Sequence, residues 1–224
     1  MTESTLSFAP VTAPEPVSVD PMLGRLGPAL ALFPLQAVHL VTLETGGGLL
    51  EGIDLVDRSV DGGAAAFAVE SALDDVPALA VLAVLLNLEP IAALGTASQP
   101  RWAERLVALR ALLPALRAHV QDPAGLLDAA GDGALAALTG VLAQAAVRRT
   151  PVLFGGSPSM VAASVLADRL APGAAAWWLA AEAPLFPAAT MGLAHLGLEP
   201  LLDLRVARRG VPLALAVLRA AAGA

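Results

Sequence analysis

Short apolar runs that end beside glycine or an acid, with helical patterns between them, constrain the fold of this chain most. The run from Gln36 to Glu44 (QAVHLVTLE) is rich in β-branched residues, which predicts a strand. Three similar runs predict further strands: Ala65 to Glu70, Pro151 to Phe154 and Ala175 to Ala181. Strands that alternate with helices favour a parallel sheet with helices on its faces. The predicted fold class is therefore α/β, in three layers.

The helical segments carry apolar residues at spacings of three and four. The clearest runs from Pro100 to Val120, where Trp102 and several leucines share one face, as expected of core packing. Pro114 lies inside this segment, which predicts a kink or a break into two helices. Further helices are predicted over residues 49–60, 75–87, 122–130, 134–149, 158–170, 188–196 and 212–222.

The composition indicates a folded domain outside the membrane. Apolar residues make up 57% of the 224 residues, enough for a substantial core. The longest clean apolar run, Val76 to Leu86, is shorter than the about 20 residues that a membrane-spanning helix needs. Met1 to Asp20 has several prolines and no basic or apolar leader pattern, so we expect a flexible arm over residues 1–30. Residues 31–224 are expected to form a single α/β domain of a cytoplasmic protein.

The charged and metal-binding residue types exclude several functions. Acidic residues outnumber basic ones by 20 to 13, and no basic stripe indicates a nucleic-acid partner. All the basic residues are arginine, so a Schiff-base lysine and a Walker lysine are excluded. The chain has no cysteine, and His39, His119 and His195 are widely spaced, which gives no support to a metal site. No cofactor is expected.

Two features at the ends of predicted strands are candidate sites. The turn from Gly155 to Ser159 follows a strand and opens a helix, where free amides favour a phosphate. The alternative, which the pattern favours, is a tight turn in which Ser157 caps the helix. Glu70 ends an apolar strand and is a candidate general base. A solvated strand end is the alternative for Glu70, and spacing alone favours it.

Three segments of the C-terminal half resemble one known family in order and spacing. They are residues 122–149 (DPAGLLDAAGDGALAALTGVLAQAAVRR), 150–172 (TPVLFGGSPSMVAASVLADRLAP) and 197–204 (GLEPLLDL), the last followed by an Ala- and Leu-rich segment. On these motifs the chain resembles the nicotinate-nucleotide:dimethylbenzimidazole phosphoribosyltransferase family, as a divergent member shortened at its N-terminus.

The resemblance implies an activity and a fold. Members transfer the phosphoribosyl group of nicotinate mononucleotide to 5,6-dimethylbenzimidazole, which yields α-ribazole 5′-phosphate for the lower ligand of cobalamin. A Rossmann-like parallel sheet with a small helical appendage is the implied fold. The implied partners are the nucleotide, the benzimidazole, and a second copy of the chain in a homodimer. Pairing with a full-length paralogue is the alternative.

Some of the family's site residues have counterparts in this chain. Glu70 matches a glutamate of the motif G-E-M-G-I-G-N-T-T and is the implied catalytic residue. Gly95 and Thr96 match part of a second glycine-rich motif. In the third motif Gly155 replaces an aspartate. Together these motifs imply a substrate- and phosphate-binding set of Gly95, Thr96, Gly155, Gly156, Ser157 and Ser159. Ala181-Glu182 also echoes the start of the family's S-A-E-P-G-H.

The chain departs from the family at the motif that carries the terminal catalytic glutamate. That motif falls on residues 207–211, which contain no acid and include Arg208 and Arg209. Two hypotheses follow: a phosphoribosyltransferase whose base has moved to Glu70, or an inactive paralogue that binds a ligand or serves as an accessory subunit. A structural remnant without a ligand is a third alternative.

Overall fold

A five-stranded sheet forms the centre of the computed structural model, which describes residues 2–6, 26–43, 47–71, 75–96, 101–204 and 210–223. The strands follow one another across the sheet in chain order: β1 (Thr2–Leu6), β2 (Val38–Leu43), β3 (Ala66–Ser71), β4 (Val152–Phe154) and β5 (Trp178–Ala180). Strands β2 to β5 are parallel, and β1 pairs antiparallel with β2 at the edge. The predicted parallel α/β sheet is thus confirmed.

The predicted helices lie close to their expected positions. The helices of the structure are α1 (Leu26–Leu32), α2 (Leu49–Asp61), α3 (Asp75–Leu85), α4 (Pro90–Leu94), α5 (Trp102–Arg117), α6 (Pro123–Ala130), α7 (Gly133–Val147), α8 (Pro158–Leu170), α9 (Pro187–His195) and α10 (Gly210–Gly223), with a 3-10 turn, η1 (Ala174–Trp177), before β5. Of these, α1, which begins within the predicted N-terminal arm, and α4 were not predicted.

Three local predictions differ from the structure. Pro114 does not divide α5 into two helices. It lies on the exposed side of α5, while Leu113 and Leu116 beside it are buried and anchor the helix. The predicted strand from Ala175 is a 3-10 turn up to Trp177, after Gly173 with φ 88°. Strand β1 lies within the expected N-terminal arm, although it pairs with β2 along its whole length. Residues 7–25 of that arm lie outside the described residues, and the division into arm and domain stays a prediction.

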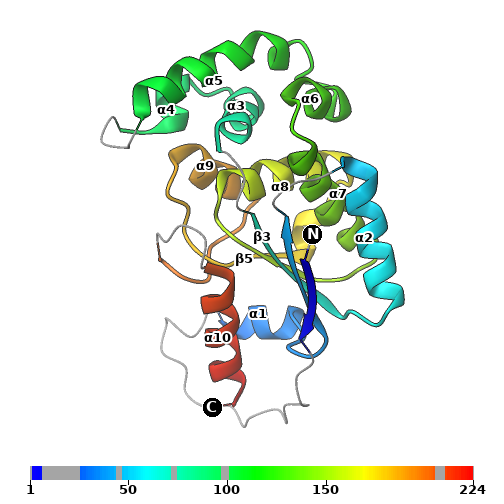
Figure 1. Cartoon of the computed structure of the whole chain (residues 1–224). Coiled ribbons are helices and arrows are strands. Elements are labelled where there is room, and N and C mark those ends of the chain that lie inside the picture. Colours follow the sequence, from blue (N-terminus) through cyan, green and yellow to red (C-terminus); the bar gives the residue numbers. More distant parts are fainter. Residues whose placement is uncertain are drawn as a thin grey trace.

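The alternation of side chains along the central strands produces the three layers. On β3, Phe67 and Val69 join the larger apolar core, while Ala66 and Ala68 face a second, smaller core. The second core is completed by apolar residues of α1 and α10. On the opposite face α2, α7 and α8 pack side by side (Figure 1).

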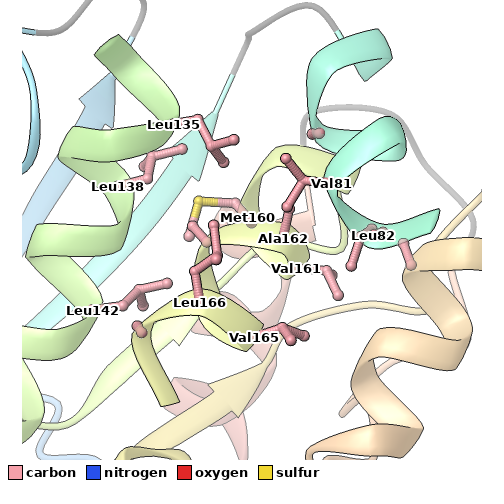
Figure 2. Close-up of a cluster of buried hydrophobic side chains, with 14 of the residues drawn as sticks. Val81, Leu82, Leu135, Leu138, Leu142, Met160, Val161, Ala162, Val165 and Leu166 are labelled. Atoms are coloured by element: carbon pink, nitrogen blue, oxygen red, sulfur yellow. The ribbon is translucent and has the colours of Figure 1, made fainter. Parts of the chain in front are cut away.

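Helices α3 to α6 form the small helical appendage above the sheet (Figure 1). Helix α3 makes the most extensive junction with the rest, since it packs against α5 and also against α8 and α9, while α4 packs against α9 as well. Figure 2 shows the junction, where Leu82 of α3 lies beside Val161 of α8, and Val81 lies beside Ala162. Leu138 of α7 and its neighbours face the other side of α8. No described helix has both the length and the apolar character needed to cross a membrane.

Helices α2 and α7 approach each other so closely that glycine is required on both. A Cβ built on Gly52 would lie 2.0 Å from the carbonyl oxygen of Ala137. A Cβ on Gly140 would lie 2.2 Å from the carbonyl oxygen of Leu49. Both obstructions are backbone atoms, which cannot turn away as a side chain can. The two glycines therefore set the distance between the helices.

We expect Gly140→Ala to lower the free energy of unfolding by roughly 1–3 kcal/mol, because α2 and α7 must separate to admit the methyl group. Chemical denaturation measures the change. The matched control is Gly27→Ala in α1, whose added methyl would meet no atom within 4 Å and which should gain about 0.5–1 kcal/mol. Equal stabilities of the two variants would contradict the proposed helix contact.

Candidate functional site

Two acidic side chains meet one helix end at the carboxyl edge of the parallel sheet. Glu70 is the second-last residue of β3, and Glu182 follows β5 by two positions. The turn after β4, which contains Gly156, lies between them in the sheet order. Helix α10 begins at Gly210 and brings its first turn to the same place. Ligands of open parallel sheets bind at this edge, so we take it as the candidate site.

Glu182 is almost fully buried, with 4% of its surface exposed. Its Oε1 accepts a hydrogen bond of 2.8 Å from the backbone N–H of Gly156. Its Oε2 is buried and has no hydrogen-bond partner among the described residues. A Cβ on Gly210 would lie only 1.7 Å from Oε2, so the carboxyl group fills the space that a side chain there would need.

Glu70 is half-buried and contacts the next residue of the same helix. Its Oε1 accepts a hydrogen bond of 3.2 Å from the backbone N–H of Val211. The first-turn amides of a helix have no partner within the helix, and they carry the positive end of its dipole. The N-terminus of α10 therefore favours negative charge at the position of this carboxylate.

Burial shifts the protonation of both acids. The pKa of Glu182 is raised from 4.5 to about 7, chiefly by burial and to a smaller extent by the charge of Glu70, while the Gly156 hydrogen bond opposes the increase. Burial also raises the pKa of Glu70, while the hydrogen bond from Val211 opposes the increase. The site thus holds two acids whose protons are exchangeable closer to neutral pH than is usual for glutamate.

The turn predicted to bind phosphate is already occupied by protein groups. The N–H of Gly156 is bonded to Glu182, and the Ser157 hydroxyl accepts from the N–H of Met160 at 3.3 Å. Ser157 is the N-cap of α8, as the tight-turn alternative predicted, and phosphate binding at this turn stays a prediction. Gly155 is buried, with its N–H bonded to Val69. Ser159 is buried, and its hydroxyl has no partner among the described residues.

The other predicted site residues belong to the helical appendage. Gly95 ends α4 with φ 85°, and its carbonyl accepts a hydrogen bond of 2.9 Å from the indole of Trp102. This bond ties Gly95 to α5 rather than to the carboxylates. Thr96 follows and is exposed. Arg208 and Arg209 lie outside the described residues.

Glu182 is the residue that the sequence analysis left out of the candidate site. The same signal that drew attention to Glu70, an acid directly after an apolar strand, is present in the stretch WLAAE. Its significance depends on burial against Gly156 and Gly210, which spacing does not reveal. Within the part of the chain that the structure describes, no group of three or more His, Asp and Glu is placed to hold a metal ion.

Comparison with known proteins identifies the family. The model of the DBI_PRT family, described as phosphoribosyltransferase, matches residues 41–224. The chain belongs to this family. The resemblance found in the motifs is thereby confirmed, and the match covers every element from β2 onward except the first residues of that strand.

Individual relatives agree with this assignment. The chain is 41% identical to the nicotinate-nucleotide–dimethylbenzimidazole phosphoribosyltransferase of Mycobacterium tuberculosis (strain ATCC 25618 / H37Rv) over 189 residues, which are 81% of this chain and 52% of the relative. The protein of that name from Mycobacterium avium (strain 104) is 41% identical over 193 residues, 83% and 55% of the two chains. The crystal structure of CobT from Thermus thermophilus matches with a TM-score of 0.66 and 29% identity, over 78% of this chain and 54% of that one.

The chain thus spans about half the length of the curated relatives it matches. The activity, substrates and partners of those whole proteins are therefore proposals for this chain.

The raised pKa of Glu182 predicts a dependence of stability on pH. Between pH 4.5 and about 7 the folded chain keeps a proton that the unfolded chain releases, so the free energy of unfolding falls as pH rises through this window. The loss is on the order of 3 kcal/mol and is complete above the upper limit. Glu182→Gln has no such proton, so its stability relative to the parent chain should increase from pH 4.5 to about 8, as measured by urea denaturation. A constant difference between the two chains over that range would contradict the shift.

Gly210→Ala should displace the Glu182 carboxyl group, because the new methyl would occupy the position of Oε2. Once displaced toward water, Glu182 should titrate nearer its ordinary range. The decrease in the free energy of unfolding as pH rises from 4.5 to about 7 should then become smaller. The control is Gly223→Ala at the other end of α10, whose methyl meets no atom within 4 Å. An unchanged pH dependence in Gly210→Ala would show that Glu182 does not need this space.

Proposed function

We propose that this chain transfers the phosphoribosyl group of nicotinate mononucleotide to 5,6-dimethylbenzimidazole, the step that makes α-ribazole phosphate for cobalamin. Membership of the phosphoribosyltransferase family supports the reaction class, and the names of the relatives support the two substrates. The observation that carries the proposal is the pair of acids with raised pKa values at the carboxyl edge of the sheet.

The reaction needs one proton acceptor. One ring nitrogen of the benzimidazole attacks C1′ of the ribose, and the bond from C1′ to the pyridine nitrogen breaks. Nicotinate leaves with the electron pair of that bond, while the N–H proton of the benzimidazole passes to a base. A carboxylate whose pKa lies nearer neutral pH accepts such a proton more effectively than an ordinary glutamate.

We assign this role to Glu70. It is half-buried and so remains open to a ligand, whereas Glu182 is enclosed. Val211 fixes one of its oxygens, which orients the carboxylate at the helix end. The position also agrees with the motif match made from the sequence. A base on β3 would make the terminal glutamate of other family members unnecessary in this chain.

The proposed phosphate contacts come from the glycine-rich motifs of the sequence. We keep Gly95, Thr96, Gly155, Gly156, Ser157 and Ser159 as the proposed substrate- and phosphate-binding residues. The buried hydroxyl of Ser159, without a described partner, supports its inclusion most. The N–H of Gly156 is bonded to Glu182, so its contact with phosphate would require that bond to rearrange, whereas the Ser157 hydroxyl accepts from Met160 and can still donate its O–H.

We also propose a cytoplasmic homodimer. The second candidate function is an inactive accessory subunit that binds ligand or pairs with a full-length paralogue, and it is supported by the lack of an acid in residues 207–211, where the family's terminal glutamate motif falls. It predicts binding of the nucleotide or benzimidazole without turnover.

Glu70→Gln should lower the rate of nicotinate release by about 10²–10⁴-fold, because the amide cannot accept the proton. Nicotinate is followed by chromatography after the chain is mixed with nicotinate mononucleotide and dimethylbenzimidazole. The matched control is Glu104→Gln on α5, where an exposed glutamate pairs only with Arg101 among the described residues. It should keep the activity of the parent chain.

Three outcomes separate the candidates. Release that is lost in Glu70→Gln and kept in Glu104→Gln supports the enzyme. Heat of binding in calorimetry without nicotinate release supports the accessory subunit. Release that persists in Glu70→Gln places the base elsewhere.

A further inference from the structure

Glu182 is buried without any described group to balance a negative charge. Only one of its oxygens has a hydrogen bond, from the N–H of Gly156, while Oε2 has none among the described residues. Of the described charged residues, Glu70 is the one whose charge acts on Glu182. That charge is of like sign. Buried charges in proteins are normally paired, because an unpaired one loses its hydration without compensation.

The described elements around Glu182 contribute no cation. The β4–α8 turn contributes Gly155 and Gly156, and the first turn of α10 contributes Gly210 and Val211. Leu202 forms a parallel β-bridge with Glu182, and the next residue, Asp203, is an exposed acid. Strand β3 contributes Glu70. The described neighbours of Glu182 are therefore uncharged or acidic.

We propose that Glu182 acts as a neutral carboxylic acid, a positioning residue that holds the Gly156 turn and the start of α10 while Glu70 alone carries the negative charge of the site. This inference rests on the proposed phosphoribosyl transfer. With Glu182 neutral, Glu70 can ionise at the helix N-terminus without a second negative charge acting on it.

Ionisation of Glu182 would disturb the site in two ways. A second carboxylate would repel Glu70 and also the phosphate of an anionic nucleotide. It would also be driven toward water, which would weaken its hold on Gly156. The proposed reaction should therefore slow as pH rises above neutral. Glutamine in place of Glu182 keeps an oxygen for the Gly156 N–H and cannot ionise, so it reproduces the neutral acid.

The first test does not depend on activity. Carbon-13 NMR of the side-chain carboxyls of the full chain, with the Glu182 signal assigned from Glu182→Gln, follows its titration. We expect Glu182 to remain protonated up to near neutral pH and to titrate at lower pH in Glu70→Gln, where the like charge is gone. A Glu182 that is ionised throughout from about pH 5 to 9 would overturn the proposal.

The second test uses the pH profile of nicotinate release. Glu182→Ala should lose about 10²-fold in kcat/KM below neutral pH, since the turn and the helix start lose their common contact. Glu182→Gln should recover most of that loss, to within about tenfold of the parent chain, and should lack the fall in rate above neutral pH. A Glu182→Gln variant as inactive as Glu70→Gln would show instead that Glu182 is the base, and so would overturn the proposal.

The two tests also separate this inference from the proposed function. If the parent chain releases no nicotinate, the proposed transfer fails, and the NMR titration still decides whether Glu182 is neutral. If nicotinate is released and Glu182 is ionised from acid pH onward, the proposed transfer is supported and the proposed neutral state of Glu182 is wrong. Glu104→Gln serves as the control in both experiments, because its exposed carboxyl belongs to α5 and not to the carboxyl edge of the sheet.

Discussion

The contact of one buried carboxyl group with two glycines holds the candidate site together. Glu182 bonds to the N–H of Gly156 and fills the space beside Gly210, so three segments that are distant in the sequence meet at its side chain. Any side chain at position 210 would displace it. Because an acid buried in this way is stable only when neutral or paired, the contact also sets the charge of the site. Geometry and protonation are thus determined by the same few atoms.

The packing of α10 connects this contact to the fold. Buried residues along the helix, among them Val211, Ala214 and Leu218, complete the core on one face of the sheet. That packing fixes where the helix begins, and the N–H of Val211 then points at Glu70 near the end of β3. The helix therefore has two roles. It covers the sheet along its length, and its first turn favours negative charge at the carboxyl edge.

The sequence predicts this fold better than it predicts the site. The reason is that helices and strands depend on residues close together in the sequence, whereas the site depends on contacts between residues far apart in it. Strands and helices follow from periodicity within a few residues, which is why β2 to β4 and the longer helices lie near their expected positions, while the short helices α1 and α4 were not predicted. The exception at Pro114 depends on which side of α5 faces the core. The site is built from pairs such as Gly156 with Glu182 and Glu70 with Val211, which are 26 and 141 residues apart. A local pattern identified Glu70 as an acid at a strand end, but only the fold reveals that a second acid is buried beside the same helix.

Residues 207–211 contain no acid, and the proposed transfer requires a suitably placed carboxylate rather than one at a particular position in the chain. Both acids and the helix end lie between residues 70 and 211, within the region that matches the family. The proton-accepting part of the site therefore does not depend on the portion of the relatives that this chain does not match. Substrate binding is different, since the described turn amide of Gly156 is already bonded. The proposed transfer thus depends less on whether a base exists than on whether donors at the carboxyl edge of the sheet are free to hold a phosphate.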